Sequence, residues 1–328
     1  MTSSYKEPSD ILKRLLLPPK NPSLALSSDY QWLILTQEPP LPSIELLAKP
    51  EEKLAGIRFD PQLLTPSRLD YATTLVLQHM KTGEKHEVPL PEDSEGIRYI
   101  RFNPVQSEFV FASKVKNEAR LELYRCQFID SASAWTATKI PLQYKMNFIQ
   151  GCAYQFSSDG SKLFLKVVPT AISTTTTPPE EPISTGPAIQ QVEKGARKAP
   201  GRTYQDLLKN EFDEAKLRYY CTTEVLCIDM TMTAATTSKA KEATLIAQSK
   251  GGHLIQSLSS SPCGRYLLAQ VTTKFSYSVP ISRFGRDVFL WDLTKNNDQE
   301  LLVASHLWWG YSDLHDNQLN NMCSNDLQ

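Results

Sequence analysis

Residues 153–165 read Ala-Tyr-Gln-Phe-Ser-Ser-Asp-Gly-Ser-Lys-Leu-Phe-Leu, and this stretch holds the pattern from which the fold is predicted. Apolar and polar residues alternate up to Phe156, a small polar segment follows, and a second apolar segment begins at Leu163. A Ser-Asp-Gly segment between two such strands suits a type I turn followed by a left-handed residue. The stretch therefore predicts a tight antiparallel hairpin.

The same order of strand, polar turn and apolar strand occurs three more times, at 24–35, 99–111 and 256–268. A second pair of strand-like segments follows each of the four, namely 74–78 with 85–88, 120–126 with 136–140, 224–229 with 243–247, and 287–292 with 300–304. Two hairpins make a four-stranded unit, which is the blade of a β-propeller. We therefore predict an all-β fold, an incomplete β-propeller of about four blades with a helical lead-in and helix-containing insertions.

The irregular spacing of the four hairpins is explained by insertions. We expect a lead-in helix within residues 1–20, blades over 21–304, and a divergent polar tail over 305–328. The insertions cover about 37–71, with a helix-like segment at 45–53, and about 169–220, with the low-complexity segment 174–182.

An amphipathic helix is predicted inside the second insertion. Thr203 can act as its N-cap, and Asp206 can reach back as in a capping box. Apolar residues then recur at helical spacing, and pairs of Asp213 with Lys216 and of Glu214 with Arg218 would support the helix.

Composition excludes several classes of partner. The 35 Lys and Arg residues balance 36 Asp and Glu, so no bulk charge favours nucleic acid or an anionic membrane. No apolar stretch approaches the roughly 18 residues of a membrane span. The six cysteines form no C-x-x-C pair, and we interpret them as free, buried thiols rather than disulfides or metal ligands. No glycine-rich phosphate loop opens a helix, so neither a cofactor nor a metal is expected.

No catalytic residue is predicted in the chain. A nucleophile elbow requires G-x-S-x-G, and the segment around Ser312 lacks the second glycine. The five histidines, His79, His86, His253, His306 and His315, lack a paired base or a metal-ligand spacing and are interpreted as surface or turn residues.

Three segments, 47–58, 186–187 with 202–220, and 275–284 with 288–292, resemble the glutamyl endopeptidase branch of the prolyl oligopeptidase family. The resemblance implies an amino-terminal propeller that restricts substrate entry, and an α/β-hydrolase domain whose Ser-Asp-His triad cleaves peptides after glutamate. The chain ends before the region where that hydrolase is expected. We therefore predict a non-catalytic, substrate-gating propeller from a truncated serine peptidase, which does not hydrolyse peptides alone; a stand-alone propeller acting as a protein-binding scaffold is the alternative.

The resemblance also suggests substrate-binding residues. A glutamate-specific peptidase needs a cation near the substrate carboxylate, and arginine can bind a carboxylate through two hydrogen bonds. Arg283, Arg286 and Arg202 are the candidates, with structural arginines in blade loops as the alternative. The expected partner is a peptide substrate. Absence of a signal peptide favours the cytoplasm, whereas a chloroplast remains open if the amino terminus is incomplete.

Overall fold

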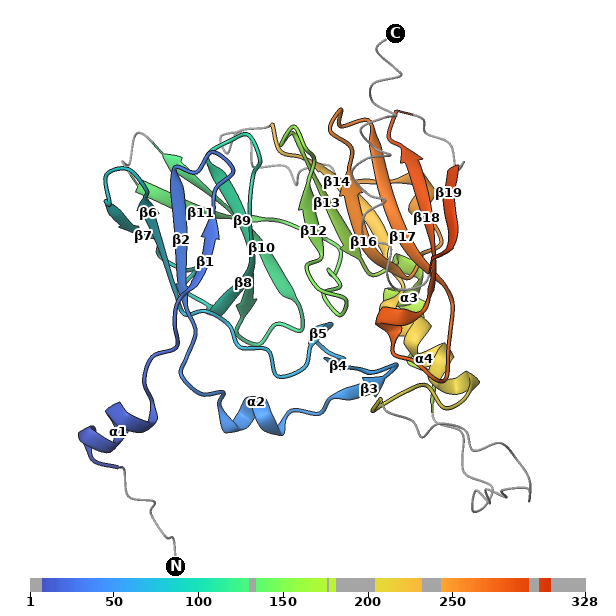
Figure 1. Cartoon of the computed structure of the whole chain (residues 1–328), viewed down its shortest axis with the longest axis horizontal. Coiled ribbons are helices and arrows are strands. Elements are labelled where there is room, and N and C mark those ends of the chain that lie inside the picture. The colour runs from blue at the N-terminus through green and yellow to red at the C-terminus, as the bar shows by residue number, and fades with distance from the viewer. Residues whose placement is uncertain are drawn as a thin grey trace, which may run out of the picture.

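The structure is a computed structural model that describes residues 8–129, 134–175, 177–180, 204–231 and 243–294, and the backbone of 301–307. Four antiparallel sheets of four strands each account for most of it (Figure 1). The first two sheets contain β1 (Ser23–Leu26), β2 (Trp32–Gln37), β6 (Thr74–His79) and β7 (Lys85–Glu87), then β8 (Ser94–Phe102), β9 (Glu108–Val115), β10 (Leu121–Ile129) and β11 (Ala134–Ile140). The all-β prediction is confirmed.

The third and fourth sheets repeat this arrangement. They contain β12 (Tyr154–Phe156), β13 (Lys162–Val167), β14 (Glu224–Asp229) and β15 (Thr244–Leu245), then β16 (Ile255–Ser260), β17 (Tyr266–Lys274), β18 (Gly285–Asp292) and β19 (Leu301–Leu307). In every sheet the strands pair in chain order, and each pair is antiparallel. The first strands of neighbouring sheets contact one another, β1 with β8 and β12 with β16. The four sheets are thus blades whose first strands face a common axis.

The first hairpin of every blade has the same backbone hydrogen bond, from an amide to the carbonyl five residues later. The four donors are Ser27, Asn103, Ser157 and Ser261, at distances of 2.8 to 2.9 Å. In three blades the serine hydroxyl also accepts from the amide five residues on. This common geometry confirms that the four hairpins are structural repeats.

Hydrophobic contacts between blades form the core. β9 is buried on both faces: Phe109 and Phe111 pack toward the first blade, whereas Val110 packs toward the third. β13 behaves alike, since Leu163 and Leu165 pack toward the second blade and Phe164 toward the fourth. Strands buried on both faces appear in sequence as continuous apolar runs rather than strict alternation. This accounts for the apolar runs at 109–112 and 163–168.

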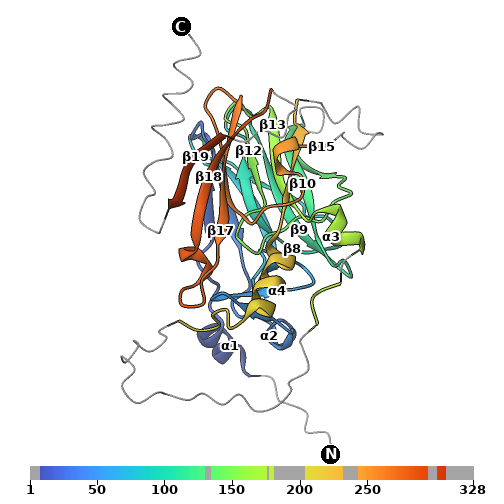
Figure 2. The same ribbon diagram turned by 90° about the vertical axis from the view of Figure 1, so that its right-hand side faces the viewer.

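A separate group of segments covers one end of the blades (Figures 1 and 2). It contains a small sheet of β3 (Glu52–Leu54), β4 (Ile57–Asp60) and β5 (Thr65–Pro66), and the helix α4 (Glu211–Cys221). Buried side chains of these segments, such as Phe59 and Leu217, share one hydrophobic cluster with Phe284 from the loop after β17. We call this group the end cluster. It joins both insertions to the fourth blade.

The remaining helices are short. They are α1 (Asp10–Leu16), α2 (Ile44–Ala48), α3 (Thr170–Thr175), and the 3-10 turns η3 (Ala247–Ser249) and η4 (Ile281–Arg283). The helix-like interpretation of 45–53 is only partly correct, because the helix ends at Ala48 and Glu52 already belongs to β3. Pro50 lies between the two elements, and proline disfavours helical backbone in the residue before it.

The predicted helix start at Thr203 is wrong. α4 begins at Glu211, and its N-cap is Asn210, whose side chain accepts from the amide of Asp213 at 2.9 Å. Thr203 lies outside the described residues. Asp206 has a left-handed backbone with φ of 56° and binds Arg58 Nε at 2.8 Å, so it is unavailable for a capping box. A tertiary ion pair therefore replaces the local cap.

Inside α4, one of the two predicted charge pairs forms. Glu214 binds Arg218 at 2.9 Å, whereas Lys216 binds Glu52 of β3 at 2.7 Å instead of Asp213. The buried face of the helix consists of Leu217, Tyr220 and Cys221.

A glycine substitution tests how the end cluster is joined to the fourth blade. Gly56 lies in the β3–β4 turn with φ of +77°, and an added Cβ would lie 2.5 Å from Pro280 Cβ. We expect Gly56→Ala to lower the free energy of unfolding by about 1–3 kcal/mol more than Gly83→Ala does. Gly83 is the matched control, because its φ is +74° and nothing lies within 4 Å of an added Cβ. Equal losses in urea unfolding would contradict this docking.

Candidate functional site: a cavity along the blade axis

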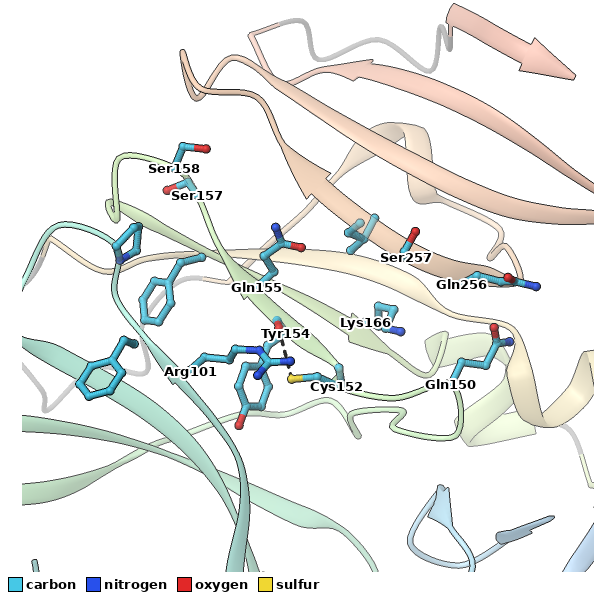
Figure 3. Close-up of a pocket in the computed structure, with 15 residues that line it drawn as sticks. Arg101, Gln150, Cys152, Tyr154, Gln155, Ser157, Ser158, Lys166, Gln256 and Ser257 are labelled. Carbon is cyan, nitrogen blue, oxygen red and sulfur yellow. Dashed lines mark hydrogen bonds between the residues drawn. The ribbon is translucent and has the colours of Figure 1, made fainter. Parts of the chain in front are cut away.

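A cavity of about 550 Å³ lies between the second, third and fourth blades (Figure 3). The first strands of these blades supply most of its lining, through Arg101 of β8, residues 154–156 of β12 and residues 256–258 of β16. Gln150, Cys152 and Ala153, just before β12, and Lys166 of β13 complete one end. Because three blades contribute, the cavity depends on their relative placement.

The lining carries positive charge. Two of its fifteen residues, Arg101 and Lys166, are cationic, and none is an aspartate or a glutamate. The uncharged polar lining residues are glutamines, serines, a cysteine and a tyrosine: Gln150, Gln155, Gln256, Ser157, Ser158, Ser257, Cys152 and Tyr154. The cavity therefore suits an anionic or polar ligand better than a cation.

The backbone of Lys166 is held by hydrogen bonds to two neighbouring segments. Its amide donates to Ala153 O at 2.7 Å, and its carbonyl accepts from the amide of Asn147 at 3.1 Å. Only 5% of the residue is exposed, and none of the described residues forms a hydrogen bond or an ion pair with its amino group. Burial lowers its pKa from 10.5 to about 8. An unpaired, buried ammonium is uncommon in proteins, because desolvation of the charge is uncompensated.

Two ionisable groups beside Lys166 are thiols. Cys152 precedes β12 and donates to Tyr154 O at 3.4 Å, and Cys221 ends α4. Burial raises the pKa of Cys152, and it raises that of Cys221 to about 12. Both thiols are therefore protonated at neutral pH and are not activated nucleophiles.

Two glutamines lie near the lysine end of the cavity (Figure 3). Gln256 Nε2 donates to Thr272 Oγ1 at 2.9 Å and to Ile281 O at 3.1 Å, which fixes its amide. Gln150 Nε2 is buried beside the Cys221 thiol and has no oxygen acceptor among the described residues. Neither amide nitrogen is therefore placed to donate to a ligand in the cavity.

The candidate arginines lie elsewhere. Arg283 belongs to η4, and its guanidinium carbon lies 5.2 Å from the centroid of the Tyr204 ring. Arg286 is the second residue of β18 and donates to Gln270 Oε1 at 3.2 Å and to Ser282 O at 2.5 Å. Its Nε is buried without a partner among the described residues. Neither lines the axial cavity. Arg202 lies outside the described residues.

The described histidines have structural contacts. His79 accepts from the amide of Thr82 at 3.2 Å. The rings of His79 and His86 also contact the ring of Trp32, with 5.0 and 5.7 Å between ring centroids. His253 Nε2 contacts Gln248 O at 3.2 Å. Ser312 and His315 lie outside the described residues, as does the side chain of His306.

None of the five cysteines within the described ranges forms a disulfide; Cys126 and Cys221 are buried, whereas Cys263 is exposed rather than buried as expected. Across those same ranges, no group of three or more His, Cys, Asp or Glu residues could hold a metal ion. No helix in the described part of the chain is both long and apolar enough to cross a membrane.

Sequence reasoning did not single out Lys166 or Arg101. A signal for Lys166 is present, since it interrupts the apolar run Leu163-Phe164-Leu165-Lys166-Val167-Val168. A charge inside a strand that reads as buried on both faces has no solvated side available. Arg101 gives no such signal. It lies in a strand where polar and apolar residues alternate, and a charged residue is ordinary at a polar position of such a strand.

Four blades with a cavity along their axis define an incomplete β-propeller. The sequence is similar to a protein of Oryza sativa subsp. japonica described as a probable chloroplastic glutamyl endopeptidase, 26% identical over 308 residues that make up 90% of this chain and 31% of the relative. A protein of Arabidopsis thaliana with the same description is 24% identical over 298 residues, 88% of this chain and 29% of the relative. The resemblance found in the sequence is thus confirmed, and the chain spans about 30% of the length of these relatives.

Solved structures with a similar arrangement include the acylaminoacyl peptidase of Pyrococcus horikoshii, with a TM-score of 0.43, 10% identity, and coverage of 90% of this chain and 34% of that one. The β-propeller domain of the Trilobed protease from Pyrococcus furiosus has a TM-score of 0.42 and 8% identity, covering 89% of this chain and 59% of that one. No protein-family model matches the chain.

Proposed function

We propose that these blades are the substrate-gating part of a glutamate-specific serine endopeptidase. The similarity to the plant glutamyl endopeptidases over nine-tenths of the chain is the observation that carries this proposal. The cavity supports it, because about 550 Å³ lies within the range of ligand sites and can hold a short peptide segment. A folded domain of roughly 100 residues, with a radius of gyration of about 13 Å, is far too large to enter.

Glutamate recognition at the blade ends is a further part of the proposal. Arg286 is the favoured residue of the three arginines, since its Nε has no hydrogen-bond partner among the described residues. Arg283 is a second candidate at the same end of the fourth blade. The names of the two relatives support a chloroplast as an alternative to the cytoplasm inferred from the sequence.

A chimera tests the gating function. Residues 8–307 of this chain would replace the aligned segment of the Oryza sativa relative. We expect the chimera to cleave short glutamate-containing peptides. It should leave a folded protein that contains the same glutamate-containing segments uncut until that protein is denatured. This chain alone is the control and should show no cleavage above background. Equal cleavage of folded and denatured protein by an active chimera would refute gating by these blades.

A further inference from the structure

We propose that the Lys166 end of the axial cavity is a binding site for the carboxylate of an acidic peptide. This inference deepens the proposed function and rests on it for the peptide nature of the ligand. Lys166 supplies the central cation, and Arg101 supplies a second cation from the neighbouring blade.

Burial without a partner is the first observation behind the site. Lys166 is 5% exposed, and its amino group has no hydrogen-bond acceptor or carboxylate among the described residues. A buried charge is normally paired, because its desolvation is otherwise uncompensated. An anion in the cavity would provide the missing partner.

The charge pattern of the cavity selects the sign of the ligand. Its two ionised lining residues are both cations, and its lining holds no carboxylate. Amide and hydroxyl groups of the lining suit a peptide backbone, and the volume of about 550 Å³ exceeds what a lone carboxylate fills. These features favour an acidic side chain within a peptide over a small free anion.

The arrangement also predicts linkage between binding and protonation. The thiols of Cys152 and Cys221 face Lys166 from the segment before β12 and from α4, and burial raises the pKa of both. Burial lowers the pKa of Lys166 to about 8, so among these three groups Lys166 changes charge first as the pH rises. A bound carboxylate favours the ammonium form of Lys166 and raises its pKa. At pH 9 binding should therefore take up close to one proton.

Calorimetric titration of the full chain tests the site. The probe is the peptide acetyl-Ala-Glu-Ala-amide, its neutral counterpart is acetyl-Ala-Gln-Ala-amide, and glutarate represents a free carboxylate. We expect the glutamine peptide to bind roughly tenfold or more weakly than the glutamate peptide, because it lacks the charged carboxylate that pairs with Lys166. Glutarate should also bind roughly tenfold or more weakly, because it lacks the contacts of the peptide backbone. Titration at pH 9 in buffers of different ionisation enthalpy should show the proton uptake.

Two lysine substitutions localise the effect. Lys166→Met should reduce affinity for the glutamate peptide about tenfold or more, abolish proton uptake and leave the glutamine peptide unaffected. Lys162→Met is the matched control on the same strand, because Lys162 does not line the cavity; it should change nothing. Circular dichroism establishes that both variants are folded.

Three results would overturn the site. These are equal affinity for the glutamate and glutamine peptides, unchanged affinity in Lys166→Met, and binding of glutarate without binding of the peptide. The chimera assay for gating depends on the size of the substrate and not on this affinity. A chimera that still discriminates against folded protein would therefore preserve the proposed function even if the carboxylate site failed.

Discussion

Lys166→Met is expected to raise the free energy of unfolding at pH 7 by about 3 kcal/mol. The wild-type side chain is charged at this pH, although burial lowers its pKa from 10.5 to about 8. When the pKa of a lysine is one pH unit lower in the folded chain than in the unfolded chain, keeping the charge in the folded chain costs about 1.4 kcal/mol. Methionine has a similar length and carries no charge, so the cost disappears.

The sign of the pH dependence follows from the lowered pKa of Lys166. Below about pH 8 both folded and unfolded wild-type chains carry the proton, and the cost is fully present. Between about pH 8 and 10.5 the folded chain has lost the proton while the unfolded chain retains it, so wild-type stability rises relative to the variant. The advantage of Lys166→Met should therefore shrink steadily from about pH 8 to pH 10.

Urea unfolding of the two chains at several pH values between about 7 and 10 measures this difference. Other titrating groups are common to both proteins and cancel in the comparison. Lys162→Met serves again as control, because Lys162 is only half-buried, and its effect should be small. A destabilised Lys166→Met at pH 7, or an advantage independent of pH, would show that Lys166 has a compensating partner.

Glu108→Leu is expected to lower the free energy of unfolding by about 3–5 kcal/mol, the usual cost of leaving one charge of a buried pair without its partner. Glu108 is 1% exposed and accepts from Arg125 Nε at 2.7 Å, while Arg125 is itself 7% exposed. The same carboxylate accepts from Asn103 Nδ2 at 2.8 Å and from Gln127 Nε2 at 2.7 Å. Loss of the carboxylate leaves all three donors without this acceptor.

A double substitution separates the ion pair from the rest of the loss. Glu108→Leu with Arg125→Met removes both charges and should recover a part of the stability, because an apolar pair replaces the unpaired cation. Glu118→Ala, at an exposed turn position of the same blade, should change stability by less than about 0.5 kcal/mol. The expectation fails if Glu108→Leu costs as little as this control, or if the double variant is less stable than Glu108→Leu.

The blades were predictable because local sequence determines them. The hairpin turn begins with a serine whose hydroxyl accepts from the amide five residues on, and Ser27, Ser157 and Ser261 all carry this signal. The pattern spans only a few neighbouring residues and occurs several times, so it can be recognised in a single sequence. The left-handed residue three positions after the serine is Gly160 or Gly264 in two blades and Tyr30 in the first.

The helix start was not predictable in the same way. Thr203 and Asp206 form a capping pattern in the sequence, but Asp206 binds Arg58, which lies 148 residues earlier in the chain. Such a tertiary contact outweighs a cap that contributes about 1 kcal/mol. The cavity was hidden for a related reason, because Arg101 and Lys166 meet only through the packing of two blades.

Hydrogen bonds between hairpin turns hold one rim of the blades. Asn103 Nδ2 donates to Gly160 O at 2.9 Å, and Ser158 Oγ donates to Ser260 O at 3.3 Å, so the second, third and fourth blades are tied in sequence. The end cluster packs against the opposite ends of the third and fourth blades (Figure 1). The third and fourth blades are therefore held at both ends, and moving them apart would break contacts at each end. A ligand would have to fit between the third and fourth blades as they stand, so its size and shape would decide whether it binds.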